Sequence, residues 1–522
     1  MTSSSTVSTR RNSLLLFLGI LVAFVLFLMS VEISNVSLSA ESKKPQNISH
    51  VLAAASECVH KVFSNDTEAC YPDTVHEIDW TKQIDAKDIL HEAALQWGCL
   101  QNQESIILHA YGEVETLNQM QLVNESDPRL FQILSQCPDV DLYTPSKVRG
   151  YGYCEDAAAY TKYLKARMLP AWVLKRQFYH ESRKRMVMYH EICPKTPMLF
   201  FNHYWDNVPF LSEWPATKSL YLMPNIEMYE IEREHLSRAD VILCKTAVCA
   251  IYVNMWFAQE GNPRGTVVMY TRHTTSNIAM VYESQLSPRE RRAKKAKDFS
   301  KVKFLHAAGK SVQKGTNEVI DCWLSRPNLP QLELRMGQKL YDTVYKDNYD
   351  RKLRDSPNVI LHTGRVEPDE FGRIISDATY FMCPSYQEGY GHYINQARAS
   401  RALIFTTDVP PMNELITPSS GILIKAKRTA HDRHFLGGLD PRNHSLRNVV
   451  GYAAEIQNTS ICGAVAKMLL FTTPEERARR ADKALQHYYF DTVFFAHKMK
   501  ELRAMASLKD FYNPATGRIT AT

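Results

Sequence analysis

The sequence predicts an α/β protein with two lobes, each built on a parallel sheet, behind an N-terminal membrane anchor. The chain has 522 residues, which is too long for one hydrophobic core. Along most of its length, short apolar runs alternate with helical patterns, as they do in proteins with parallel sheets. A hydrophobic content of 45% and a charged content of 23% are ordinary for a globular protein.

The predicted anchor is an uncharged apolar run at residues 13–31, just long enough to cross a bilayer. Arg10 and Arg11 precede it and Glu32 follows it, which orients residues 1–12 towards the cytosol. A cleaved signal peptide is the alternative. The run is longer than the apolar core of such a peptide, about 7–15 residues. We therefore expect a single-pass type II membrane protein whose body faces the lumen of the Golgi or the endoplasmic reticulum.

Residues 32–97 are interpreted as a lumenal stem and a lead-in to the first lobe. Six N-x-Ser/Thr sequons agree with a lumenal body, although the pattern is common by chance: Asn35, Asn47, Asn65, Asn124, Asn443 and Asn458. The 11 cysteines form no C-x-x-C pair, so no zinc framework is indicated. In an oxidising lumen some should form disulfides, with Cys58 and Cys70 as candidates. Cys244, Cys249 and Cys383 lie in or beside apolar runs and are expected to pack as buried thiols.

The first lobe is assigned to residues 98–285. Its helical pattern at residues 155–168 places several apolar side chains on one face. Its expected strands are short apolar runs at residues 106–108, 186–188, 198–201, 220–223, 241–243 and 267–270.

A basic linker at residues 286–300 leads to the second lobe, residues 301–472. The linker accounts for most of the net charge of +6. The rest of the chain therefore has no concentration of positive charge of the kind that binds nucleic acid. Expected strands of the second lobe lie at residues 304–307, 359–361, 380–382, 403–405 and 422–424.

The chain should end in helices within residues 473–522. Thr473, Pro474 and Glu476 have the spacing of an N-cap, a first-turn proline and a third-position glutamate. A further helix is expected over about residues 491–506.

The most informative segment is residues 385–396, where an apolar run, a glycine-bearing turn and a helix start follow one another. Backbone N–H groups and the positive end of a helix dipole converge on such a turn and attract an anion. Glu388 lies at its mouth, where a carboxylate accepts hydrogen bonds from hydroxyl groups and repels a bare phosphate. A nucleotide-sugar satisfies both demands, because it has a phosphate end and a polyol end.

Two other turns should lie at the same sheet edge, where open α/β sheets bind ligands. Gly309 allows a phosphate to approach the backbone, and Lys310 and Lys314 can neutralise a departing diphosphate. Solvent-facing lysines are the simpler alternative. Arg365 and Val366 follow the next glycine, and their backbone can border a nucleobase or form an ordinary loop. Residues 407–414 either line the same cleft or form a rigid turn.

In their order, these turns resemble the C-terminal domain of retaining, GT-B-fold glycosyltransferases of the glycosyltransferase group 1 family. The matching residues are Gly309-Lys310 with Lys314-Gly315, Gly364-Arg365-Val366, and Pro384-Ser385 with Glu388-Gly389-Tyr390-Gly391. The resemblance is strong over residues 301–425, about a quarter of the chain. It implies two Rossmann-like lobes facing a central cleft, with the donor on the second lobe and the acceptor on the first.

The resemblance also implies roles for individual residues. Lys310 and Lys314 would hold the donor diphosphate, and Glu388 would bind the transferred sugar together with the backbone of Gly389, Tyr390 and Gly391. Gln396 stands where the family has a second glutamate that binds ribose, so a weakened ribose contact is expected. Lys310 stands where the family usually has arginine. A lysine keeps the positive charge but cannot bind a phosphate through two parallel N–H groups as arginine does.

The family also places a first-lobe histidine near the sugar. His203 is the first candidate for a catalytic role beside Glu388, and His273 is the second. Residues 150–152 carry two glycines that either let a phosphate or acceptor approach the backbone or form a simple turn.

The resemblance therefore implies transfer of a hexose from a UDP- or GDP-sugar to a glycan, lipid or protein, with retention and without a metal cofactor. One alternative is a catalytically degenerate GT-B protein that acts as a glycan-binding or scaffold membrane protein. Another is a nucleotide-sugar epimerase, which the anchor and the sequons disfavour.

Overall fold

The computed structural model describes residues 48–61, 67–113, 121–150 and 152–507 and two short strands, β19 (Tyr512–Asn513) and β20 (Arg518–Ile519). The predicted cytosolic tail and the predicted anchor at residues 13–31 lie outside the described residues. So do Asn35, Asn47 and Asn65. Within the described part of the chain, no helix has the length and apolar character needed to cross a membrane. Residues 51–522 form one unit and residues 1–50 another, and both lobes belong to the former.

Short helices precede the first lobe, and the sixteen-residue α5 leads into it. Asp85 caps α5 by accepting a hydrogen bond from the backbone N–H of Lys87 at 2.8 Å. The elements of this segment are α2 (Ile48–Ser56), α3 (Cys58–Lys61), η1 (Thr67–Cys70), α4 (Asp73–His76), η2 (Trp80–Lys82) and α5 (Ala86–Gln101).

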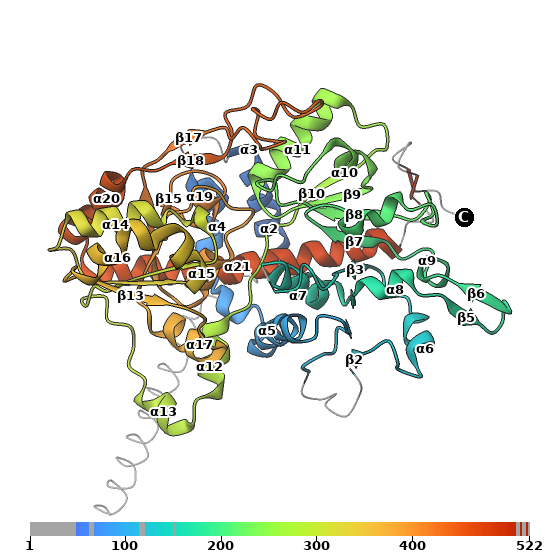
Figure 1. The fold of residues 1–522 in the computed structure, drawn as a ribbon, viewed down its shortest axis with the longest axis horizontal. Coiled ribbons are helices and arrows are strands. Elements are labelled where there is room, and N and C mark those ends of the chain that lie inside the picture. Colours follow the sequence, from blue (N-terminus) through green and yellow to red (C-terminus); the bar gives the residue numbers. More distant parts are fainter. Residues whose placement is uncertain are drawn as a thin grey trace, which may run out of the picture. The chain divides into compact units, whose positions relative to one another are not determined.

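The first lobe is built on an eight-stranded sheet with the order β10-β9-β8-β7-β3-β4-β1-β2 (Figure 1). Pairing is parallel from β10 to β4, whereas β1 pairs antiparallel with both β4 and β2. The strands are β1 (Ile106–Ile107), β2 (Leu122–Val123), β3 (Asp141–Tyr143), β4 (Met168–Leu169), β7 (Met198–Phe201), β8 (Leu220–Met223), β9 (Val241–Cys244) and β10 (Val267–Tyr270). The predicted strands at 198–201, 220–223, 241–243 and 267–270 are confirmed.

Two predictions in this lobe are confirmed only in part. The run at residues 186–188 belongs to a separate hairpin of β5 (Phe178–His180) and β6 (Arg185–Val187), outside the parallel sheet. The helix predicted at 155–168 is α7 (Tyr153–Leu164). It ends because Lys165 adopts a left-handed conformation with φ of 54°, and the chain then enters β4. The other helices are α6 (Leu130–Leu134), α8 (Ala171–Lys175), α9 (Tyr189–Ile192), η4 (Trp205–Phe210), α10 (Arg233–Arg238) and α11 (Ala247–Glu260).

The second lobe is built on a six-stranded, fully parallel sheet with the order β13-β12-β11-β14-β15-β16. The strands are β11 (Phe304–Gly309), β12 (Leu332–Met336), β13 (Val359–Thr363), β14 (Tyr380–Cys383), β15 (Leu403–Thr407) and β16 (Ile422–Ile424). All five predicted strands are confirmed, and β12 was missed. Its helices are α14 (Thr316–Ser325), α15 (Gln338–Leu340), η6 (Tyr341–Tyr345), α16 (Lys346–Arg354), α17 (Pro368–Asp377), α18 (His392–Ala399), α19 (Met412–Leu415) and α20 (Asn458–Phe471), with η5 (Val312–Lys314) before α14.

The chain reaches the second lobe before the basic segment. A buried polar stretch, residues 271–277, follows β10 and leads to α12 (Ile278–Gln285). The helix α12 packs closely on α17, since a Cβ on Gly372 would lie 3.0 Å from the carbonyl oxygen of Ile278. The basic segment then forms α13 (Pro288–Ala293), which is largely exposed.

A long excursion from the second lobe completes the core of the first. It lies between β17 (Lys427–Thr429) and β18 (Ala453–Glu455). Phe435, Leu436 and Tyr452 of this excursion are buried in the same cluster as Phe200 and Trp256. The two lobes are therefore joined by hydrophobic packing as well as by the chain.

The C-terminal helix α21 (Pro474–Ser507) runs from the second lobe to the first (Figure 1). Thr473 accepts a hydrogen bond from the backbone N–H of Glu476 at 3.2 Å, which confirms the predicted N-cap. Residues 491–506 are helical as predicted, but they belong to the continuous helix α21 and form no separate helix. Buried Asp491 in its middle pairs with Arg272 at 2.6 Å and with Arg398 at 2.8 Å, one residue from each lobe. This buried network fixes α21 between the lobes.

Five disulfides occur in the described part of the chain: Cys58–Cys70, Cys99–Cys154, Cys137–Cys193, Cys244–Cys249 and Cys322–Cys462. Cys58 and Cys70 are thus confirmed as bridged. The prediction that Cys244 and Cys249 are free thiols is wrong, because the end of β9 and the first turn of α11 bring them together. Cys383 is free and buried, as predicted.

Candidate functional site

The turn between β14 and α18 has the conformation that an anion site requires. Gly391 is the N-cap of α18 with φ of 105°, a conformation that favours glycine. Hydrogen bonds hold the turn from both sides. The backbone N–H of Tyr386 donates to the carbonyl of Gln313 at 2.9 Å, and the Thr407 hydroxyl donates to the carbonyl of Ser385 at 2.7 Å. The first N–H groups of a helix point towards its N-terminal end, where an anion can accept from them. At α18, those of Ile394 and Asn395 already donate to the carbonyl of Gly391 at 2.9 Å and 3.0 Å.

The structure brings Lys314 and Glu388 into direct contact at this turn. Lys314 Nζ lies 2.5 Å from Glu388 Oε1 and 3.9 Å from the ring centroid of Tyr393. Ser385 donates its hydroxyl to the same carboxylate oxygen at 2.5 Å. Gly315 makes the approach possible, because it has φ of 62° and a Cβ there would lie 2.1 Å from the carbonyl oxygen of Pro384. The first and third predicted turns therefore form one site.

The other predicted donor residues lie nearer the surface. Gly309 has φ of 59° and its carbonyl accepts from the N–H of Gly337 at 2.7 Å, while Lys310 is exposed. Arg365 is also exposed, and its ion-pair partner is Glu367 at 4.0 Å. Val366 is half-buried against the second core. The donor-binding roles of Lys310, Arg365 and Val366 stay predictions.

The first lobe faces this turn with an ionic cluster centred on Asp156 of α7. Its Oδ1 atom accepts from Lys245 Nζ at 2.8 Å, from His273 Nε2 at 2.7 Å and from His392 Nε2 at 3.2 Å. Burial alone would raise the pKa of Asp156, but Lys245 and the two histidines hold it well below its usual value. Burial lowers the pKa of His273 to about 3. His392 is the first residue of α18, so the cluster joins the two lobes beside the site.

This geometry distinguishes the two histidine candidates. His203 lies against Trp205, with ring centroids 4.1 Å apart, and 5.6 Å from His235, all within the first lobe. Burial lowers its pKa. His273, the second candidate, lies 5.2 Å from Tyr390 and 5.5 Å from His392 of the second lobe, measured between ring centroids. The structure therefore brings His273 to the turn, and does not bring His203 into contact with it among the described residues.

Gln396 also contacts the first lobe. Its Nε2 donates to Glu155 Oε1 at 3.1 Å, while Glu155 Oε2 accepts from the backbone N–H of Ser276 at 3.0 Å and from its hydroxyl at 2.7 Å. Gly152, at the end of the glycine-bearing turn 150–152, lies against His392, since a Cβ there would be 3.7 Å from its ring. Gly152 therefore approaches the second lobe.

Sequence reasoning missed Asn225 and Glu227 of the first lobe, whereas it had considered the element 407–414 that contains Glu414. Asn225 and Glu227 follow β8 and lie directly against Gly389. Glu414, in the predicted element 407–414, accepts from the N–H groups of Ala247 at 2.6 Å and Val248 at 3.0 Å and so caps α11 of the other lobe. The only sequence signal for Asn225 and Glu227 is their position after a confirmed strand.

Besides a group of candidate ligands formed by His91, His109 and Glu113, two features of the described residues bear on metal binding. Asp156, His273 and His392 offer ligand atoms within 4.8 Å of one another, but the ammonium group of Lys245 already supplies positive charge to the shared Asp156 oxygen. An Asp-x-Asp sequence occurs at Asp139–Asp141, and there Asp141 is buried and bound by both Arg167, at 2.7 Å, and the Tyr189 hydroxyl, at 2.5 Å.

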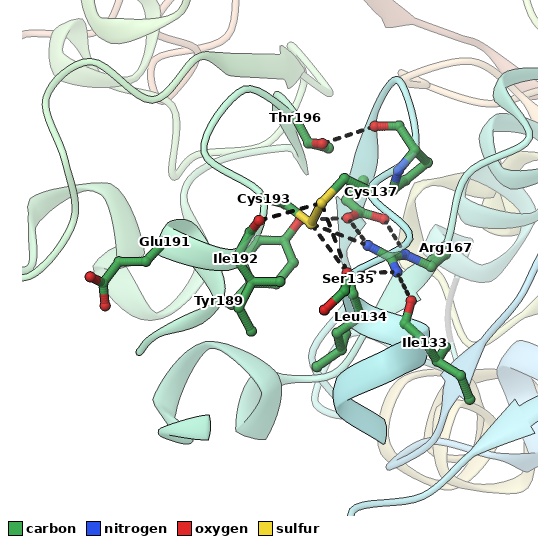
Figure 2. The surroundings of a disulfide bond; sticks show 12 residues. Ile133, Leu134, Ser135, Cys137, Arg167, Tyr189, Glu191, Ile192, Cys193 and Thr196 are labelled. Carbon is green, nitrogen blue, oxygen red and sulfur yellow. Dashed lines mark hydrogen bonds and ion pairs between the residues drawn. A yellow bond between two sulfur atoms is a disulfide. The ribbon is translucent and has the colours of Figure 1, made fainter. Parts of the chain in front are cut away.

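The environment of Asp141 is structural. Figure 2 shows Arg167 and Tyr189 beside the Cys137–Cys193 disulfide. Arg167 also donates to the carbonyl of Ile133 at 2.8 Å. Since guanidinium and phenol groups already occupy the Asp141 carboxylate, this Asp-x-Asp sequence has no free pair of carboxylates for a metal ion.

Comparisons with known proteins rest on the fold. No protein-family model matches the sequence, and no curated protein matches it. Among solved structures, the pneumococcal O-GlcNAc transferase GtfA in complex with UDP and GlcNAc is similar over 60% of this chain, with 13% identity and a TM-score of 0.41. This chain spans 57% of the length of that transferase.

Two further structures are similar to this chain. Sucrose-phosphate synthase from Thermosynechococcus elongatus matches 71% of this chain and 98% of its own, with 11% identity and a TM-score of 0.46. An alpha,alpha-trehalose-phosphate synthase (UDP-forming) from Burkholderia vietnamiensis matches 60% of this chain and 72% of its own, with 11% identity and a TM-score of 0.42.

Proposed function

We propose that the protein is a glycosyltransferase that moves a hexose from a UDP- or GDP-sugar to a glycan, lipid or protein acceptor. The observation that carries this proposal is the contact between Lys314 and Glu388 at the N-terminus of α18, facing the first lobe. A cation, a helix N-terminus and a carboxylate at one point match the diphosphate and the hydroxyl groups of a nucleotide-sugar.

The roles follow from the charges. Lys314 and the N-terminus of α18 stabilise the negative charge that develops on the nucleoside diphosphate when its bond to the anomeric carbon breaks. Glu388 accepts hydrogen bonds from sugar hydroxyl groups once the ligand displaces Lys314 from it. The acceptor hydroxyl, on the first-lobe side, forms the new bond to the anomeric carbon with retention of configuration and gives its proton to the departing diphosphate oxygen. Because protein groups supply the positive charge, the proposed reaction needs no metal ion.

Location in the secretory pathway belongs to the same proposal. Disulfides persist in oxidising compartments, and the described residues contain five. The sequon residues Asn124 and Asn443 are exposed, so both are accessible to glycosylation. Together with the apolar run at residues 13–31, these observations support a type II protein with a lumenal body in the endoplasmic reticulum or Golgi.

The test is turnover of labelled UDP- and GDP-sugars by Lys314→Ala and Glu388→Ala variants. Each change removes a group at the reacting centre, so we expect a loss of activity of at least about 100-fold. Lys346→Ala, which removes an exposed lysine paired with Asp342 at 3.6 Å, is the matched control and should retain activity. Wild-type turnover in either site variant would contradict the assignment.

One observation favours a degenerate, non-enzymatic protein. Gln396, expected to contact ribose, is already bonded to Glu155 of the other lobe. Calorimetry separates the two functions. A scaffold binds glycan without binding a nucleotide-sugar, whereas a transferase binds the donor and turns it over.

A further inference from the structure

A group of oxygen atoms on the first lobe meets the sugar-binding turn at Gly389. A Cβ on Gly389 would lie 2.5 Å from Glu227 Oε1, 2.6 Å from Glu227 Oε2 and 2.7 Å from Asn225 Oδ1. A Cβ at this position would force the ends of these two side chains to move. Two polar side chains of the other lobe therefore lie directly against the backbone of Gly389.

These oxygens lack the partners that buried polar atoms normally have. Glu227 Oε2 and Asn225 Oδ1 are buried and accept no hydrogen bond from the part of the chain that the structure describes. Asn225 as a whole is only 8% exposed. Buried acceptors without donors are rare and costly in folded proteins, and a ligand that supplies the donors explains them.

The loop that carries Asn225 and Glu227 is fixed. Ile226 is buried, and its carbonyl accepts from the hydroxyl of Tyr452. Arg442 donates to the carbonyl of Tyr229 at 3.2 Å, and Arg433 lies 3.9 Å from the Tyr229 ring centroid. All three partners come from the excursion between β17 and β18. The oxygens are therefore held in place before any ligand binds.

The charges around the oxygens define the ligand. Burial raises the pKa of Glu227 to about 7, with Lys245 opposing the shift and the nearby Glu388 charge adding to it. A phosphate placed here would meet Glu227 and Glu388 at once. The fitting ligand is an uncharged one with several hydrogen-bond donors, and hydroxyl groups of a sugar have that character.

We propose that Asn225 and Glu227 bind hydroxyl groups of the transferred sugar from the first lobe, opposite Glu388. This rests on the proposed function and adds to it, because it assigns the choice of sugar to a first-lobe loop that no motif marks. Lys314 and the N-terminus of α18 then bind the diphosphate, so that sugar and nucleotide recognition belong to different residues.

The experiment compares binding of UDP with UDP-glucose, and of GDP with GDP-mannose, by calorimetry on the whole protein. Glu227→Gln and Asn225→Ala should weaken the nucleotide-sugar by about tenfold or more and leave the nucleoside diphosphate within about twofold. Glu230→Gln, an exposed carboxyl of the same loop, is the control and should change neither. Equal changes for nucleotide and nucleotide-sugar, or no change in either variant, would overturn the inference. Failure of the wild-type protein to bind any of the four probes would instead refute the proposed function.

A second measurement identifies the hydroxyl group concerned. UDP-sugars that lack one hydroxyl each are tested against wild type and Glu227→Gln. Removing the hydroxyl that Glu227 binds should lower the binding free energy, and so should Glu227→Gln. These two losses of binding free energy should not add, because either change removes the same hydrogen bond. Additive losses at every position would refute a direct contact. So would Ca²⁺ binding to the wild type that Glu227→Gln abolishes, because the oxygens would then be a cation site.

Discussion

Gln396 of α18 donates a hydrogen bond to Glu155 of α7, with 3.1 Å between Nε2 and Oε1, and so joins the two lobes beside the candidate donor site. Burial raises the pKa of Glu155, whose other oxygen accepts from Ser276. A glutamate at position 396 would place a second carboxylate against Glu155. The contact between the lobes therefore gives a physical reason for glutamine at a position where the resembling family has glutamate.

Gln396→Glu should destabilise the protein at pH 8. The new carboxylate replaces an N–H donor and repels Glu155, which we expect to lower the free energy of unfolding by about 1–3 kcal/mol. Urea denaturation measures this. Adding Glu155→Gln restores a donor–acceptor pair and should recover most of the loss. A Gln396→Glu variant as stable as wild type would contradict the importance of this contact.

Gly315→Ala should disrupt the candidate site by separating the backbone at Gly315 from the carbonyl oxygen of Pro384. The added Cβ would lie 2.1 Å from the Pro384 carbonyl oxygen at a residue whose φ is 62°. We expect a loss of about 1–3 kcal/mol of stability and weaker donor binding, since Lys314 is the preceding residue. Gly463→Ala in α20 is the matched control, because nothing lies within 4 Å of the new Cβ. It should gain up to about 1 kcal/mol from helix propensity. Equal effects of the two substitutions in thermal denaturation would refute this account.

Glu92 should make stability depend on pH. Burial and the charge of Glu155 raise its pKa from 4.5 to about 8. Since the folded pKa lies above the unfolded one, the contribution is fully present below about pH 4.5 and is lost as the pH rises through about 8.

Glu92→Gln should therefore flatten the decline in the free energy of unfolding between pH 5 and about 8, by up to about 1.4 kcal/mol per pH unit. Urea titrations at a series of pH values test this. Glu57→Gln changes an exposed carboxyl and serves as the control. Identical pH profiles for wild type and Glu92→Gln would show that Glu92 does not titrate in this range.

The disulfides predict a definite thiol count. Unfolded but unreduced protein should expose one thiol, that of Cys383, and fully reduced protein should expose 11. The Cys322–Cys462 bridge spans a sequence separation of 140, so Cys322→Ser with Cys462→Ser should cost about 4–5 kcal/mol by loop entropy. Cys383→Ser leaves every bridge intact and is the control. A count above one before reduction would disprove the five pairings.

The strands that sequence reasoning found and missed differ in a physical way. The apolar runs at 198–201 and 380–382 are buried on both faces and are continuous in sequence, so their pattern is unambiguous. β12 alternates buried and half-buried residues and includes Glu333 and Arg335. Its sequence therefore lacks the continuous apolar run by which the other strands were recognised. β3 and β4 span only a few residues, too few for any period to emerge.

By itself, the sequence determined what depends on neighbours along the chain. These features are five of the six second-lobe strands, the turns with Gly315 and Gly391, the N-cap at Thr473, and Lys314 and Glu388 as charged residues of the candidate site. Each follows from a local pattern, because backbone conformation and helix termini are set within a few residues.

Only the tertiary structure decided which residues of the first lobe face that site. The contacts of His392 with Asp156, of Gln396 with Glu155 and of Gly389 with Asn225 join residues far apart in the chain. They exist because the excursion between β17 and β18, helix α21 and the buried Asp491 pairs hold the lobes in one arrangement. No local pattern records that arrangement. For this reason His273 and Glu227, and not His203, lie at the turn from which the site was predicted.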